Sequence, residues 1–212
     1  LAGIELRLFA HYLARYDGGR YAKILLEDDI HQVNADKIGI SRRQVKTITY
    51  CFLYGGGNQK LGLSYDNMLS PDAAAKKGAE IRKAYMEAIP GLESLVNATR
   101  KVAEKGTIRA IDRRNIRVDK EHKALNFLLQ GSAAVLAKRW LLITDHNLRM
   151  SNFEHERYAF VHDEQVLGAP TEQAKNIAEV CKLSAILAGE FYNLRIPIEA
   201  DANIGNNWAE VH

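Results

Sequence analysis

The stretch SRRQVKTITYCFLYGGG, residues 41–57, carries the clearest indication of structure in the chain. Ser41 is a residue type that favours the position before a helix, and a run of glycines favours helix termination. Between them the apolar residues Val45, Ile48 and Phe52 recur at helical spacing. We therefore predict a helix that begins after Ser41, ends just before the glycines and packs this apolar side into a core.

Another side of the same helix carries Arg42, Lys46, Tyr50 and Tyr54, each four residues from the next. Residues at this spacing form one continuous stripe along a helix. Two cations followed by two aromatic rings suit a nucleoside triphosphate, which has phosphates at one end and a stacking base at the other. On spacing alone, a solvated basic edge with two half-buried tyrosines is the more common explanation, because amphipathic helices often have Lys and Arg outside.

The stretch YAFVHDEQVLGAP, residues 158–170, places His162, Asp163 and Glu164 between two short strand-like runs. We predict a β-hairpin with these three residues at its tight turn. Adjacent carboxylates repel each other unless a cation is bound, and a pair of Mg²⁺ ions suits phosphoryl transfer. A solvated acidic turn is the alternative. A two-metal site usually needs a further carboxylate, for which the sequence offers four equal candidates: Glu27, Asp28, Asp29 and Asp201.

Residues 106–118 alternate β-branched and polar residues, which predicts a second hairpin with a basic tip around Arg113 and Arg114. Its charges could contact a phosphate backbone or simply be solvated. Residues 122–150 predict a long apolar helix with Asn126 and Gln130 on one face. These amides need hydrogen-bond partners, and DNA minor-groove edges, primer sugars or each other could supply them.

The remaining segments predict a helix-rich α+β body without an internal repeat or flexible linker. Residues 4–16 suggest a short strand or turn leading into a helix, and residues 71–105 suggest two helices separated at Ile89-Pro90-Gly91. Residues 171–191 predict an amphipathic helix, followed by a tail with a short strand and a loop.

Composition adds broad limits. Of the 212 residues 47% are hydrophobic, as in an ordinary globular domain, and 29 Lys and Arg against 26 Asp and Glu give a net charge of +3. Cys51 and Cys181 lie far apart with no zinc-type spacing, which favours a reduced, cytoplasmic setting. Neither a membrane-spanning run nor a signal peptide is apparent, so we expect no membrane partner.

Six segments, taken together and in this order, resemble the polymerase half of a family A (polymerase I-like) DNA polymerase, and the short phage replicative branch in particular. They are GIELRLFAHY from Gly3, DIH from Asp29, RRQVKTITYCFLYG from Arg42, ALNFLLQGSAA from Ala124, VHDE from Val161 and GNNWAEVH from Gly205. Any one match would be weak, but six in order across the chain are specific.

The resemblance implies an α+β fold with a polymerase palm, an antiparallel sheet with helices, and mostly helical fingers. Residues 1–30 would be the truncated start of the palm, 31–105 the fingers, and 106–212 the rest of the palm with a C-terminal tail. The implied activity is that of a DNA-directed DNA polymerase, a nucleotidyltransferase that adds dNTPs to a primer 3′-hydroxyl with two Mg²⁺ ions as cofactors.

The resemblance also implies roles for individual residues, at the positions that match the family motifs. Asp163 and Glu164 would be catalytic, and Asp163 with the backbone carbonyl of Leu1 would bind metal. The nucleotide-binding residues would be Arg42, Lys46, Tyr50, Tyr54, His31 and Glu5, of which Glu5 and Tyr54 would exclude a ribose 2′-hydroxyl. The DNA-binding residues would be Arg114, Asn126, Gln130 and His162.

Three positions depart from the family pattern. The principal metal-binding aspartate of the family would stand immediately before Leu1, so we expect a C-terminal fragment of a longer polymerase, with little or no activity by itself. Arg113 stands where the family has glycine in the basic hairpin, and Cys51 replaces the glycine after the first tyrosine of the stripe. Both substitutions bear on local backbone geometry.

Two other functions fit part of the pattern: a single-subunit RNA polymerase fragment, and a non-catalytic nucleotide- or DNA-binding module. Glu5 and Glu164 argue against the first, and the repulsive carboxylates of Asp163 and Glu164 argue against the second. A purely structural helical protein would make the stripe a coincidence. The expected partners are primer-template DNA and dNTP, with a processivity factor as a further candidate, in the cytoplasm of a phage-infected bacterium.

Overall fold

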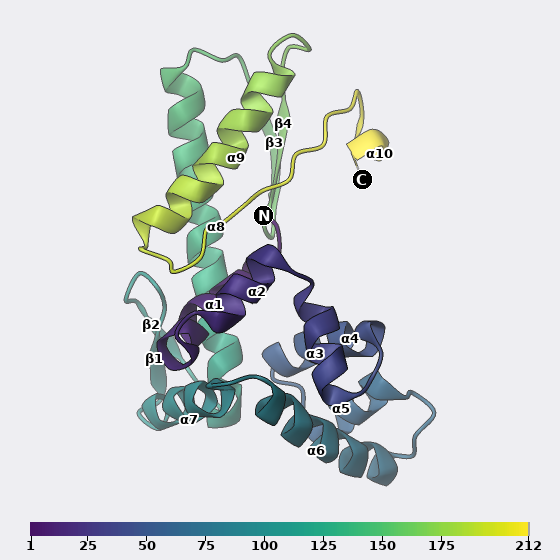
Figure 1. Ribbon diagram of the computed structural model, residues 1–212. Coiled ribbons are helices and arrows are strands. Elements are labelled where there is room, and N and C mark those ends of the chain that lie inside the picture. Colours follow the sequence, from purple (N-terminus) through teal and green to yellow (C-terminus); the bar gives the residue numbers. More distant parts are fainter. Residues whose placement is uncertain (212) are drawn as a thin grey trace. The chain divides into compact units, whose positions relative to one another are not determined.

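The computed structural model describes residues 1–211, which form two compact units (Figure 1). Unit 1 contains Leu1–Leu8 and the chain from Gly131 onward, and unit 2 contains Phe9–Gln130. The chain passes between them within helix α1 (Ile4–Asp17) and within helix α8 (Ala124–Met150). The palm and fingers boundaries inferred from the family resemblance, at residues 30 and 105, remain a prediction.

Unit 2 is mostly helical, and several of its elements follow the predicted pattern. The helix predicted after Ser41 is confirmed, as is the interruption between two helices at Ile89–Gly91. The segment predicted as a strand or turn before the first helix is a turn, and Ile4 already lies in α1. The other helices of the unit are α2 (Arg20–Glu27), α3 (Ile30–Ile38), α4 (Arg42–Leu53), α5 (Asn58–Tyr65), α6 (Pro71–Ala88) and α7 (Leu92–Ala103).

Helices α5 and α6 approach each other at backbone distance through two buried glycines. A Cβ atom on Gly62 would overlap the carbonyl oxygen of Ala74, and one on Gly78 would overlap the carbonyl oxygen of Asn58. Only hydrogen atoms fit between the two backbones at these positions. This contact orders the segment that follows α4 in the chain.

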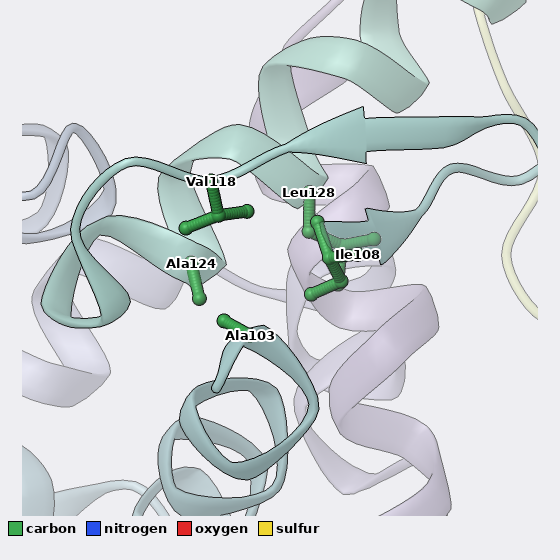
Figure 2. Close-up of a cluster of buried hydrophobic side chains, with 5 residues drawn as sticks. All are labelled: Ala103, Ile108, Val118, Ala124 and Leu128. Carbon is green, nitrogen blue, oxygen red and sulfur yellow. The ribbon is translucent and has the colours of Figure 1, made fainter. Parts of the chain in front are cut away.

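A two-stranded hairpin of β1 (Thr107–Arg109) and β2 (Asn115–Arg117) follows α7, as predicted. Ile108 pairs with Ile116, and because side chains alternate along a strand this places both isoleucines on one face. Figure 2 shows Ile108 beside the other members of a buried cluster, to which α7 and α8 also contribute. The cluster consists of Ala103, Ile108, Val118, Ala124 and Leu128.

The tip of this hairpin contains Arg113, which has a φ of 69°. This is the left-handed region that glycine adopts readily and other residues rarely adopt. The turn therefore keeps a glycine-like conformation although the side chain is that of arginine. Arg113 N donates to the Ala110 carbonyl at 2.9 Å, a hydrogen bond that closes the tip.

Unit 1 is built around the C-terminal part of α8 and helix α9 (Ala174–Phe191). Trp140 donates from Nε1 to the Cys181 carbonyl at 2.8 Å, and Asn147 donates from Nδ2 to Ser184 Oγ at 3.1 Å. These bonds join the two helices along their length. The unit also contains the hairpin of β3 (Glu156–Val161) and β4 (Glu164–Gly168), followed near the end of the described chain by the short helix α10 (Trp208–Val211).

The tail was predicted to contain a short strand, and this prediction is wrong. Residues 194–207 form no strand; one backbone bond, from Ala2 N to the Glu199 carbonyl at 2.9 Å, joins them to the start of the chain. Arg7 holds the tail through its side chain, donating to the Pro197 carbonyl at 2.7 Å and to the Glu199 carboxylate at 2.6 Å. Side-chain contacts therefore replace the strand ladder that the apolar alternation suggested.

None of the helices within residues 1–211 combines the length and the apolar composition that crossing a membrane would require.

Candidate active site

The predicted functional residues fall into two groups, one in each unit. The group in unit 2 lies on α4, whose start is fixed by a capping box: Gln44 N donates to Ser41 Oγ at 3.3 Å, and Ser41 N donates to Gln44 Oε1 at 3.1 Å. Val45, Ile48 and Phe52 are buried. The opposite stripe, Arg42, Lys46, Tyr50 and Tyr54, is thereby kept at the surface or half buried.

Arg42 is oriented by Asp29, the residue that caps α3. Arg42 donates from Nε to Oδ2 of Asp29 at 2.5 Å, and the other oxygen, Oδ1, accepts from the backbone nitrogens of His31 and Gln32. The hydrogen bond from Arg42 and the capping bonds hold the pKa of the Asp29 carboxyl below its usual value. No described residue accepts from Nη1 or Nη2 of Arg42, so its two-nitrogen fork remains available to an anion.

His31 lies beside this cluster and is buried. Burial lowers the pKa of its imidazole, the nearby Asp29 opposes that effect, and the cations of Arg42 and Lys46 lower the pKa further. Its Nδ1 atom has no hydrogen-bond partner among the described residues. The lowered pKa favours the neutral form of the His31 imidazole, which lies next to the cations of Arg42 and Lys46.

The aromatic part of the stripe begins next to His31. The ring centroids of His31 and Tyr50 are 6.2 Å apart, and those of Tyr50 and Tyr54 are 6.3 Å apart with an interplanar angle of 28°. Tyr54 is 44% exposed at the C-terminal end of α4. The helix therefore presents an aromatic surface one turn beyond its cations, which is the layout that the sequence predicted.

Cys51, the departure from the family glycine on this helix, is buried and lies against Gly56. A Cβ on Gly56 would be 2.5 Å from the Cys51 Sγ atom. The thiol therefore fills space that the following glycine leaves open, and the helix continues through residue 51 without distortion.

In unit 1 the predicted acidic hairpin is confirmed, except that Glu164, predicted to lie in the turn, is the first residue of β4. Val161 pairs with Glu164, so His162 and Asp163 form a two-residue turn between β3 and β4. His162 has a φ of 54°, in the left-handed region, which is unusual for a residue with a side chain and recurs at functional turns. His162 and Glu164 are exposed, and Asp163 is half buried.

The start of the chain lies at this turn. The Leu1 nitrogen donates to the backbone carbonyl of Asp163 at 2.7 Å, although the two residues are 162 positions apart. Glu5 follows in the first turn of α1, in the same unit. Leu1 therefore lies beside Asp163, as the family resemblance implies, whereas the predicted role of Glu5 with the nucleotide-binding residues stays a prediction.

The β3–β4 turn has oxygen donors of the type that a hard divalent cation prefers, but fewer of them than such a cation takes. Asp163 and Glu164 supply carboxylates, and the backbone of Leu1 lies against Asp163. Mg²⁺ takes about six oxygen ligands, usually including water and substrate phosphate. Within residues 1–211 no three His, Cys, Asp or Glu side chains are grouped as metal ligands. The pair of Mg²⁺ ions, and the metal-binding role of Leu1, stay predictions.

Two of the predicted DNA-binding residues, Asn126 and Arg114, have hydrogen-bond partners in the protein. Asn126 donates from Nδ2 to the Leu53 carbonyl at 3.3 Å, which connects α8 to the end of α4. Arg114 donates from Nε to Asp112 at 2.5 Å and is otherwise exposed. Gln130, one helical turn after Asn126, is exposed. Their role in DNA binding stays a prediction.

The residue pattern offered Asp29 as one of four carboxylates that could complete a metal site, whereas the structure pairs it with Arg42. Its carboxylate is engaged with Arg42 and with the N-terminus of α3. An aspartate directly before a helical pattern is a capping signal, and that reading would have identified it. Its pairing with a residue 13 positions later required the structure.

Comparison with known proteins gives consistent matches over nearly the whole chain. The family model for DNA polymerase family A matches residues 2–210. A DNA-directed DNA polymerase of Enterobacteria phage T3 is 32% identical over 234 aligned residues, covering 100% of this chain and 32% of that protein. DNA polymerase I of Bacillus caldotenax is 27% identical, covering 97% of this chain and 25% of that protein. The chain thus spans about a third of the phage relative.

A solved structure shares the fold. The POL domain of Pol1 from M. smegmatis, in complex with a DNA primer-template and dNTP, matches with a TM-score of 0.81 and 21% sequence identity. The match covers 99% of this chain and 39% of that one. Because the family model matches residues 2–210, well over half of the chain, the chain belongs to DNA polymerase family A.

Proposed function

We propose that the chain carries the nucleotide-binding helix and part of the catalytic centre of a DNA-directed DNA polymerase. The observation that carries the proposal is the stripe on α4. Arg42 is held by its Nε with its fork available, Lys46 follows one turn later, and Tyr50 and Tyr54 stack beyond them. Membership of the family supports the same reading.

Each residue of the stripe would bind a different part of a dNTP. The guanidinium fork of Arg42 would bind phosphate oxygens with two parallel hydrogen bonds, and Lys46 would add a second positive charge. His31 would lie close to the same phosphates. Tyr50 would pack against the nascent base and sugar, with Tyr54 behind it. Glu5 would exclude a ribose 2′-hydroxyl.

At the β3–β4 turn, Asp163 and the Leu1 carbonyl would hold metal, with Glu164 as a nearby carboxylate. Two bound Mg²⁺ ions would supply the positive charge that phosphoryl transfer needs. In the reaction the primer 3′-oxygen loses its proton and bonds to the α-phosphorus. The bond from that phosphorus to the bridging oxygen breaks, and pyrophosphate leaves.

Leu1 lies at the acidic turn. Its nitrogen is 2.7 Å from the Asp163 carbonyl, so a residue attached to that nitrogen would be bound next to the acidic turn. An aspartate there would complete a pair of carboxylates on adjacent backbone segments.

The remaining assignments follow from the same proposal. Primer-template DNA is the partner, and Arg114, Asn126, Gln130 and His162 would contact it near the growing end. A processivity factor is a candidate partner in the whole protein. Residues 1–30 and 106–212 would belong to the palm and 31–105 to the fingers. The protein would work in the cytoplasm of a phage-infected bacterium, as expected for a relative of phage polymerases.

A primer-extension assay tests the proposal with three chains: the 212-residue chain, the same chain with one aspartate added before Leu1, and the added-aspartate chain with Asp163→Asn. We expect extension only from the second, and only with Mg²⁺. Calorimetry measures dNTP binding to all three chains and therefore reports on the α4 stripe independently of turnover. Extension that survives Asp163→Asn would exclude the catalytic assignment, and an added-aspartate chain that neither binds dNTP nor extends a primer would refute the proposed function.

A further inference from the structure

A cavity of about 360 Å³ lies within unit 2, directly after the α4 stripe. Its wall begins with Phe52 and the three glycines that end α4, and α5, α6, α7 and α8 each contribute residues. The volume is at the lower end of the range for small-ligand sites. None of the residues assigned above to nucleotide binding lines it.

Arg82 of α6 forms one side of the cavity and is held rigidly. It donates from Nε to Asn58 Oδ1 at 2.7 Å and from Nη2 to the Gly56 carbonyl at 2.5 Å. Its guanidinium carbon lies 5.4 Å from the centroid of the Phe52 ring. The charge of Arg82 is thus fixed at the cavity wall by neutral partners, and Nη1 has no hydrogen bond to a described residue.

A second arginine, Arg100 of α7, lines the same cavity. Burial lowers the pKa of the Arg82 guanidinium, and the like charge of Arg100 lowers it further. The lining residues include no Asp or Glu, whereas His122 adds a third potential cation. Two arginines that face one cavity without a carboxylate create a positive potential that an anion would relieve.

Backbone groups add to this potential. Gly57 and Asn58 line the cavity at the start of α5, and the N-cap residue Gly57 makes no side-chain capping bond. The first backbone N–H groups of a helix carry partial positive charge. They support, but do not by themselves define, a site for an anion beside Arg82.

We propose that this cavity binds a phosphate group of a DNA strand, through Arg82 and Arg100. A phosphodiester presents two unesterified oxygens that match the planar donors of arginine, and its single negative charge is stabilised between the held guanidinium of Arg82 and the cation of Arg100. The inference rests on the proposed polymerase function, because a chain that acts on DNA brings strand phosphates to its surface. A free phosphate compound, such as dNTP or pyrophosphate, shares this chemistry and is distinguished by the experiment.

The experiment compares the 212-residue chain with Arg100→Gln, in which the changed side chain is exposed and the fold should be kept. Arg82→Lys is the second variant, since it keeps the charge but loses the fork. Matched controls are Lys101→Gln, next to Arg100, and Lys83→Gln, next to Arg82; both lysines are exposed and line no part of the cavity. Circular dichroism and thermal melting establish that each variant is folded.

Three probes are used. Fluorescence anisotropy at several salt concentrations measures the binding of a labelled single-stranded oligonucleotide. Calorimetry measures the binding of dNTP and of pyrophosphate. We expect Arg100→Gln to weaken oligonucleotide binding about fivefold to tenfold and to reduce the salt slope by about one, while both lysine controls change it less. Arg82→Lys should weaken it similarly. Neither arginine variant should change dNTP or pyrophosphate affinity, whereas Lys46→Gln should lower the affinity for dNTP.

The contrary outcomes are distinct. If the arginine variants bind the oligonucleotide as the lysine controls do, or if they lose affinity only for dNTP or pyrophosphate, the cavity is not a strand-phosphate site and the inference fails. The proposed function then still stands, provided that Lys46→Gln weakens dNTP binding. A wild-type chain that binds none of the three probes would refute both.

Discussion

Arg42 and Asp29 form an ion pair at 2.5 Å that joins the first turn of α4 to the N-terminus of α3. The pair uses only Nε of the guanidinium, so the carboxylate orients the side chain without occupying the fork. An exposed ion pair of this kind contributes little to stability, about 1 kcal/mol or less. Its importance therefore lies in where it directs the remaining two nitrogens of Arg42.

The first prediction concerns this orientation. Arg42→Lys keeps the charge but loses both Nε and the fork, so we expect dNTP affinity to fall by about tenfold. The adjacent Arg43→Lys is the matched control, because Arg43 is exposed on the same helix and lies outside the stripe. Calorimetric titration with dNTP checks the difference, and equal losses in the two variants would show that only net charge matters.

The second prediction is a pH dependence of stability that arises from His31. Burial lowers the pKa of the folded imidazole below its unfolded value of about 6.5. As the pH falls through that value, the unfolded chain gains a proton that folded His31 does not accept, so the free energy of unfolding decreases. Above about pH 7 the imidazole is neutral in both states, and the effect vanishes.

The measurement is urea unfolding of the wild type and His31→Gln between pH 5 and pH 8. The variant should lose less stability on acidification than the wild type. His146→Gln is the control, because His146 is exposed on α8. Parallel pH profiles for the wild type and His31→Gln would contradict the assignment.

The third prediction concerns the close contact of α5 and α6. Gly78→Ala places a methyl group against the Asn58 backbone, which cannot move without displacing α5. We expect a loss of about 1–3 kcal/mol or more in the free energy of unfolding. Because Asn58 also holds Arg82, oligonucleotide binding should weaken as well. The control is Ala79→Gly, at an exposed position of α6, because it tests helix propensity alone. Gly106→Ala would not serve as a control, because Gly106 has a positive φ.

The fourth prediction concerns the turn at Arg113. Glycine adopts the left-handed φ of 69° without strain, so replacement of Arg113 by glycine raises the free energy of unfolding. The larger conformational entropy of glycine in the unfolded chain offsets part of that gain. We expect Arg113→Gly to stabilise the protein by up to about 1 kcal/mol, whereas Arg113→Ala gives no stabilisation. Chemical denaturation of the three proteins checks this. An alanine variant as stable as the glycine variant would mean that the side chain, not the backbone, is the source of strain.

The fifth prediction tests Glu5 as the residue that selects deoxyribonucleotides. In the chain with the added aspartate, Glu5→Ala should raise ribonucleotide incorporation relative to deoxyribonucleotide incorporation by about tenfold or more, because removing the side chain makes room for the 2′-hydroxyl. Glu179→Ala, on the exposed face of α9, is the control. An unchanged ratio would remove Glu5 from the specificity assignment, and a wild-type preference for ribonucleotides would favour the RNA polymerase alternative.

The segments that could be predicted from sequence are those whose structure depends on near neighbours. Ser41 and Gln44 form their capping box within one turn, and Val45, Ile48 and Phe52 mark the buried side of α4 by spacing alone. The β3–β4 turn was equally predictable because short apolar runs on both sides required a hairpin. The tail was mispredicted since its apolar alternation looked like a strand, while its actual contacts come from Arg7, almost 200 residues earlier.

Spacing along the sequence predicted the helix after Ser41 with its stripe, the long helix before the acidic hairpin and the two hairpins, and six ordered motifs indicated the family. These features follow from hydrogen bonds and side-chain spacing within a few residues, which any chain with this pattern must satisfy. The pairing of Asp29 with Arg42 and the placement of Arg82 and Arg100 at one cavity depend on tertiary packing. The hydrogen bond from the Leu1 nitrogen to the Asp163 carbonyl joins two segments that the family resemblance had already brought together. Such contacts join distant segments, and only the packing of whole helices fixes which side chains meet.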